Sequence, residues 1–323
     1  MAIRFTNYSH IHPLMRAFLA YNDYDYDDRE NVISATSIMK PTHMVVLERA
    51  NKGSERIMDI EGMIPSVGGN ALHDRLELAL NNTDNETWKA LGVVDPEDLE
   101  ILTEQRAEAK IGEHIVSGKY DMLFKYKDAR WQLGDLKSLS VWGMMIDFKS
   151  KEEEWIKQMS IYRYLNQDKD IDDKAMILTW YTDWSKSDSV IKVKQNYPQS
   201  RTEVFEVTLW SLDKTEKYLM NQEANIVDGL KRYKKTGETG YSCSTKELWM
   251  KKSGWAYYSK STSKRATKVC DTQEQAEMLK LKAKDPTAYI EERKPEATRC
   301  KYCAVQDFCN QYAEFLAKGM IKI

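Results

Sequence analysis

The first 242 residues of the chain contain no cysteine, and all five cysteines lie in the last quarter of its 323 residues. Small secreted domains held by disulfides have an even number of cysteines spread over a short chain, so this distribution excludes that class. Cysteines that gather near one end of an intracellular chain indicate metal ligation instead. The five are Cys243, Cys270, Cys300, Cys303 and Cys309.

Long apolar runs are also missing. No stretch approaches the roughly 18 to 20 apolar residues that a membrane span requires, and the first segment lacks the apolar stretch of a signal peptide. We therefore expect a cytoplasmic protein with no membrane partner. The net charge of −2 excludes a chain that is basic throughout, so any surface that binds nucleic acid must be local.

The apolar pattern predicts an α/β domain between residues 61 and 240. A helix, three strands, a second helix, further strands and a long closing helix follow one another there, an order typical of a sheet covered by helices. We expect a helical extension over residues 1–60. After residue 240 the sequence becomes basic and aromatic and then rich in cysteine, so we expect residues 241–323 to pack on the core as a separate region.

Two carboxylates and a lysine occupy residues 117–138, a segment with the pattern of a β-hairpin. Asp135 and Lys137 are two residues apart, so in a strand they point to the same face. Antiparallel pairing around a turn at residues 125–130 would place Asp121 beside Asp135. Two carboxylates this close repel each other unless a cation lies between them, and Mg²⁺ prefers such oxygen ligands. The alternative is a surface hairpin with an ordinary ion pair.

Four short motifs resemble those of the PD-(D/E)XK nuclease superfamily, and of its RecB-like exonuclease branch in particular. The motifs are GGNALH, which ends at His73, GKYD, which ends at Asp121, GDLK, which contains Asp135 and Lys137, and QMSIY, from Gln158 to Tyr162. Their order and spacing agree with the family over about residues 68–165. The resemblance implies a restriction-endonuclease-like core, a mixed sheet flanked by helices, and a deoxyribonuclease that depends on Mg²⁺ or Mn²⁺.

The resemblance also implies a role for each matched residue. Lys137 would orient the attacking water and stabilise the charge that builds on the phosphate. Gln158 and Tyr162, four residues apart on one helix face, would hold the DNA strand or steady the lysine. Glu77 and Glu108 are candidate accessory acids near the motifs, but we do not include them in the site. The implied ligands of the divalent metal are His73, Asp121, Asp135 and the carbonyl of Leu136.

Cys300, Cys303 and Cys309 form a C-x2-C-x5-C motif, which brings three thiolates together. The segment around Cys243 resembles the one that donates a remote fourth cysteine in phage-type members of the branch, and we expect Cys270 to be a bystander. Four thiolates hold a [4Fe–4S] cluster or Zn²⁺. The resemblance to CRISPR-adaptation nucleases and AddB-type nuclease domains favours the iron–sulfur cluster in a structural role, although their first cysteine often precedes the core. Zinc and unligated buried cysteines are the alternatives.

Basic and aromatic residues alternate in the segment between the first and third cysteines. Lysine and arginine suit phosphates, and aromatic rings can stack on unpaired bases, so we expect this segment to guide DNA ends. An ordinary solvated charged surface is the alternative. The expected contacts are Lys251, Lys252, Trp255, Lys264 and Arg265.

Together these features predict a metal-dependent exonuclease that acts on single-stranded or duplex DNA ends in degradation, recombination or repair. A phage-like segment before the first motif suggests a viral or mobile-element protein, with a recombinase, a helicase or a single-strand-binding protein as partner. Two alternatives use the same residues differently: a DNA-binding recombination partner with a vestigial nuclease site, and a structure-specific endonuclease. A zinc-stabilised adaptor is a third.

Overall fold

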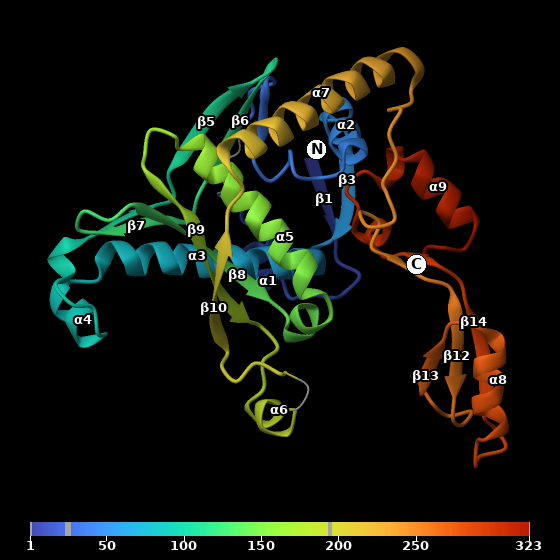
Figure 1. Ribbon diagram of the computed structural model, residues 1–323. Helices are drawn as coiled ribbons and strands as arrows, with labels where there is room; N and C mark the ends of the chain where they lie inside the picture. The colour runs from blue at the N-terminus through green and yellow to red at the C-terminus, as the bar shows by residue number, and fades with distance from the viewer. Residues whose placement is uncertain (1, 23–26, 193–195, 323) are drawn as a thin grey trace. The chain divides into compact units, whose positions relative to one another are not determined.

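The computed structural model describes the chain except for residues 1, 23–26, 193–195 and 323 (Figure 1). The chain forms two compact units. One contains residues 2–40 and 55–227, and the other contains residues 41–54 and 228–323. Among the described residues, no helix has both the length and the apolar character needed to cross a membrane.

A five-stranded sheet is the centre of the first unit, in the order β10-β9-β8-β7-β4. Strand β8 is parallel to β9 and antiparallel to β7, so the sheet is mixed. Its core consists of alternate apolar residues such as Leu133, Ala175 and Ile177, which have no exposed surface. The strands are β4 (Leu99–Thr103), β7 (Met122–Tyr126), β8 (Trp131–Leu139), β9 (Ile171–Tyr181) and β10 (Thr202–Thr208).

Two smaller sheets belong to the same unit. In the first, β6 (His114–Lys119) lies between the parallel strand β2 (Val32–Ser34) and the antiparallel strand β5 (Arg106–Ile111). The second consists of β1 (Ala2–Thr6) and β3 (Glu55–Asp59), which are parallel.

Two helices of this unit carry predicted site residues. Helix α3 (Ile64–Asn82) runs along β4 and β8, and helix α5 (Val141–Leu165) packs on β8, β9 and β10. The hydroxyl of Ser140 caps α5 by accepting from the Gly143 N–H, and the buried face of α5 includes Met159 and Tyr162. The unit also contains α1 (Pro13–Ala20), α4 (Asn85–Ala90) and α6 (Lys186–Ile191), and α7 (Leu212–Thr236) begins in it.

The second unit combines helix α2 (Thr42–Ala50), the end of α7 and the C-terminal part of the chain. Helix α8 (Gln273–Leu281) packs on a three-stranded antiparallel sheet of β12 (Gly254–Tyr258), β13 (Lys268–Cys270) and β14 (Tyr289–Arg293). The short strands β11 (Met250–Lys251) and β15 (Glu296–Ala297) pair with each other, and helix α9 (Asn310–Ala317) follows the last cysteine.

The predicted α/β class is confirmed, but the predicted order of elements is only partly right, because five strands, β4 to β8, and not three lie between α3 and α5. The expected division is different, because residues 1–60 do not form one helical extension. Strands β1, β2 and β3 belong to sheets of the first unit, and residues 41–54 belong with the C-terminal region. Strand β2 pairs with β6, about 80 residues later in the chain, so local patterns do not reveal it.

Candidate metal and catalytic site

The predicted hairpin brings the two motif aspartates together. Strand β7 pairs with β8 so that Met122 lies opposite Gly134, which places Asp121 and Asp135 at adjacent positions of the two strands. The main-chain N–H of Leu136 donates to Asp121 Oδ2 over 2.7 Å. The carboxylate of Asp121 is therefore held against the strand that carries the other aspartate.

Asp135 is a buried carboxylate in an ion pair with Lys137. Its side chain is 1% exposed, and neither of its oxygens has a hydrogen-bond partner among the described residues. Lys137 Nζ lies 2.6 Å from Asp135 Oδ2, a close ion pair. Burial, together with the charge of Asp121, raises the pKa of Asp135 to about 6. A buried carboxylate with unused lone pairs is chemically suited to a cation.

Lys137 is held from two elements. Its amine donates to Gln158 Oε1 over 3.0 Å, and Gln158 Nε2 donates to the Tyr162 hydroxyl over 3.0 Å. Burial lowers the pKa of Lys137, but the nearby Asp135 and Asp121 raise it more, so its net pKa is above the ordinary value. The lysine side chain is still 23% exposed, so a substrate can reach it, whereas Tyr162 is only 5% exposed. Of the two predicted roles for Gln158 and Tyr162, the contacts favour steadying the lysine.

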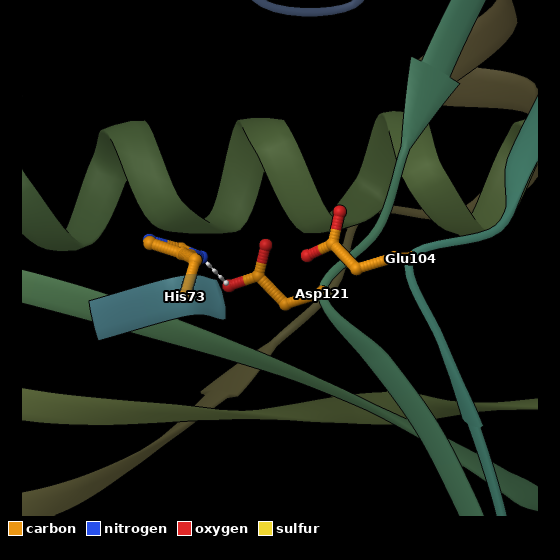
Figure 2. A group of neighbouring side chains, drawn as sticks. All are labelled: His73, Glu104 and Asp121. Carbon is orange, nitrogen blue, oxygen red and sulfur yellow. Dashed lines mark ion pairs between the residues drawn. The ribbon is translucent and has the colours of Figure 1, made fainter. Parts of the chain in front are cut away.

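A third carboxylate joins the site, and the sequence did not indicate it. Figure 2 shows Glu104 facing Asp121 from the loop after β4, with His73 of α3 on the other side of Asp121. Ligand atoms of these three residues all lie within 4.8 Å of one another, and His73 Nδ1 is 3.1 Å from Asp121 Oδ2. Within the described parts of the chain, this is the only such group of three His, Cys, Asp or Glu donors.

The backbone explains how Glu104 reaches this position. Thr103 pairs with Met122, so Glu104 follows directly opposite Asp121, and its N–H donates to the Asp121 carbonyl over 3.2 Å. Glu104 has φ +51°, a left-handed conformation that is uncommon for this residue type and is often found at functional sites. In the sequence, Glu104 can be recognised only as the residue that follows an apolar strand. The register between β4 and β7 is needed to place it beside Asp121. Glu108, the other acid near this strand, is an ion-pair partner of Arg29.

The pKa values of Glu104 and His73 are both raised above their ordinary values. Burial raises the pKa of Glu104, as does the charge of Asp121, against the opposing effect of Lys119 at 2.5 Å. Burial lowers the pKa of His73, but Asp121 and Asp135 more than offset it, so the net pKa is raised. Lys119 lies close to Glu104, and His73 lies close to Asp121. The carboxylate oxygens and the imidazole nitrogen of this group are ligand types that divalent metals use.

The four cysteines expected to be ligands line one small cavity of about 20 Å³ in the second unit, enough for roughly one water-sized occupant. Cys309 caps α9 by accepting from the Tyr312 N–H, and Gln311 fixes the backbone of Cys243 with two hydrogen bonds of 2.9 Å. All are free thiols. Burial, then neighbouring groups that include the other thiols, raises the pKa of Cys243 to about 12 and that of Cys300 to about 11. Cys270 lies in β13 and does not line this cavity.

His43 also lines this cavity, although no sequence motif points to it. It is 7% exposed, and burial lowers its pKa. No spacing motif connects residue 43 with a cysteine more than 250 positions away.

The expected DNA contacts are partly accessible. Lys251, Lys252, Lys264 and Arg265 are exposed, although Lys251 also lies 3.3 Å from Glu296. Trp255 is half-buried in the central strand β12, opposite Cys270 and Glu292, so only part of its ring could meet a base.

Comparison with known proteins adds little to this geometry. No protein-family model matches the chain, and no curated protein matches it significantly. Among solved structures, SSO0001 is similar over 62% of this chain and 78% of its own, with 15% identity and a TM-score of 0.40. A phage-related exonuclease from Haemophilus somnus 129PT is similar over 45% of this chain and 65% of its own, with 16% identity and a TM-score of 0.25. Both TM-scores are below 0.5, so these similarities do not assign a function to the chain.

Proposed function

We propose that this chain is a metal-dependent deoxyribonuclease with a PD-(D/E)XK core, acting as an exonuclease on DNA ends. The observation that carries the proposal is the buried Asp135 carboxylate, which forms an ion pair of 2.6 Å with Lys137 and lies on the strand next to Asp121. A buried charge pair is expensive for stability alone, so a functional reason for it is favoured.

The divalent metal, Mg²⁺ or Mn²⁺, would be held by the group of His73, Asp121 and Glu104. Asp135 and the Leu136 carbonyl are the further ligands that the resemblance implies. When bound, the metal would supply a hydroxide-like nucleophile and neutralise phosphate charge. Lys137 would donate hydrogen bonds to the attacking water or to the phosphate oxygen that gains charge. Gln158 would hold the amine in place while Tyr162 fixes the amide orientation.

The cysteine cavity supports a second metal, separate from catalysis. We propose that Cys300, Cys303 and Cys309 hold an iron–sulfur cluster or a zinc ion together with a fourth donor, for which the resemblance implies Cys243. Thiols that surround one buried cavity are a donor set for soft cations. Such a metal would fix the C-terminal segment. The exposed lysines and Arg265 of the same unit would bind DNA phosphates. We also propose a recombinase, a helicase or a single-strand-binding protein as the partner of this chain.

Paired variants on several DNA forms test the nuclease. Wild type, Asp135→Ala and the control Asp128→Ala, an exposed turn residue, are compared on end-labelled single-stranded, duplex and covalently closed circular DNA with Mg²⁺ or Mn²⁺. We expect wild type and Asp128→Ala to degrade linear DNA and leave closed circles intact, and Asp135→Ala to be inactive. Cleaved circles would indicate an endonuclease. If all three proteins bind DNA and none hydrolyses it, the chain is a DNA-binding recombination partner with a vestigial nuclease site.

A further inference from the structure

His43 contacts the cysteine site through one ring nitrogen and is fixed through the other. It lies in the first turn of α2, with Nε2 3.3 Å from Cys309 Sγ and Nδ1 2.7 Å from Thr239 Oγ1. Both His43 and Thr239 are buried, at 7% and 2% exposure, so water does not compete for these contacts.

The hydroxyl of Thr239 determines which nitrogen of His43 carries the proton. It donates its one proton to the Tyr241 carbonyl over 2.9 Å and accepts from the Tyr241 N–H over 3.1 Å. A hydroxyl has one proton and two lone pairs. Its remaining lone pair must therefore accept from His43 Nδ1–H, which leaves Nε2 unprotonated.

An unprotonated Nε2 beside Cys309 has a specific consequence. In the free protein the Cys309 thiol can donate its proton to Nε2. When the thiol becomes a thiolate ligand, that proton is lost, and two lone-pair-bearing atoms would face each other at 3.3 Å. A cation bonded to both atoms removes this repulsion. Histidines that bind metals characteristically donate their other N–H to an oxygen acceptor, as His43 does.

The spacing also indicates how many metal ions are involved. Around one tetrahedral zinc, bonds of about 2.0–2.1 Å to nitrogen and 2.3 Å to sulfur place the two ligand atoms roughly 3.5 Å apart. The separation of 3.3 Å and the small cavity both agree with a single ion. No three of the cavity donors have their ligand atoms within 4.8 Å of one another, so the other thiols lie further from the His43–Cys309 pair. These thiols would have to move toward the ion when it binds.

From these contacts we infer that His43 Nε2 is the fourth ligand of a single zinc-type ion bound by Cys300, Cys303 and Cys309. The inference rests on the proposed cysteine site and refines it from four thiolates to a Cys3His set. Four ligands saturate such an ion. Cys243 lines the same cavity but would then not be a ligand.

X-ray absorption at the metal edge of the full-length protein, purified anaerobically from cells supplied with iron and zinc, tests the ligand set without any variant. We expect about one zinc per chain, fitted by one nitrogen at about 2.0–2.1 Å and three sulfurs at about 2.3 Å. A fit with four sulfurs, or iron with iron–iron scattering, would overturn the inference. A protein without metal would overturn both the inference and the cysteine site.

Variants provide the second arm, measured as zinc affinity by chelator competition. His43→Leu should weaken zinc binding more than 100-fold, and His43→Cys should restore most of it, because a thiolate can take the same position. Cys243→Ser and the exposed control His10→Ala should change affinity less than threefold. Unchanged affinity in His43→Leu, together with a large loss in Cys243→Ser, would show that the thiolate site is right and the histidine assignment wrong.

Discussion

The amine of Lys137 lies 2.6 Å from Asp135 Oδ2 and 3.0 Å from Gln158 Oε1, so strand β8 and helix α5 both determine its position. This arrangement makes the lysine a fixed donor and not a mobile surface charge. The side chains that fix it and the carboxylates around it can be tested separately.

Replacing Lys137 with methionine should reduce the cleavage rate by about 100- to 1,000-fold, the cost of losing one donor to developing charge. Metal affinity should not fall, because the aspartates, which would be the ligands, remain. Single-turnover cleavage and calorimetric titration with Mn²⁺ check the two quantities. Lys149→Met, an exposed residue of α5, should cleave at the wild-type rate. A Lys137 variant that retains more than a tenth of the rate would remove the lysine from the mechanism.

Gln158→Leu should lower kcat about tenfold with little change in KM if, as proposed, the glutamine positions the Lys137 amine through their hydrogen bond. Tyr162→Phe should have a smaller effect in the same direction, because it removes the hydroxyl that accepts from the Gln158 amide and leaves the contact between Gln158 and Lys137 in place. Steady-state kinetics on a labelled duplex separates the two parameters. A rise in KM with unchanged kcat would instead support a direct contact with the DNA strand.

Glu104→Gln should weaken Mn²⁺ binding by about 10- to 100-fold, the range seen when a group that supports or joins a metal site is lost. Glu108→Gln is the matched control, because Glu108 pairs with Arg29 and is not a member of the His73 group. Equal affinities for both variants and wild type would exclude Glu104 from the site.

Metal binding should weaken at acid pH. The pKa of Asp135 is raised to about 6, so below that pH the metal-free protein holds a proton that must leave before the carboxylate can bind metal. One competing proton lowers affinity about tenfold per pH unit, and the raised pKa of His73 extends the effect upward. Titrations between pH 5 and 8 should show this slope.

Without metal, the raised pKa of Asp135 makes the folded protein less stable as the pH rises, whereas metal binding becomes stronger. The folded state holds the Asp135 proton more tightly than the unfolded state, so the contribution of Asp135 to the free energy of unfolding falls as pH rises from about 4 to about 6. Denaturation in EDTA, compared between wild type and Asp135→Asn, measures it. The same pH slope in both proteins would contradict the assignment.

The exposed Lys264 and Arg265 should contribute to DNA affinity through phosphates alone. Replacing both with alanine should reduce the slope of log affinity against log salt by about 0.7–0.9 for each phosphate that is no longer neutralised, without changing sequence preference. Lys235→Ala, an exposed residue at the end of α7, is the control. An unchanged slope would place the DNA elsewhere.

The sequence identified those parts of the site that lie within short, continuous motifs. The β7–β8 hairpin and the α5 spacing of Gln158 and Tyr162 are local, so strand alternation and helix periodicity were sufficient to place them. Glu104 depends on the register between β4 and β7, and His43 on packing against a segment more than 250 residues later. Neither relationship leaves a periodic signal, because both are set by tertiary pairing.

The position of β8 between two hydrogen-bonded neighbours has a consequence for the durability of the site. Edge strands and termini open by local fraying, whereas central strands exchange their amide protons only through large-scale opening. The segment that carries Asp135 and Lys137 should therefore be among the slowest-exchanging parts of its unit. Its geometry would be lost only when the whole sheet comes apart.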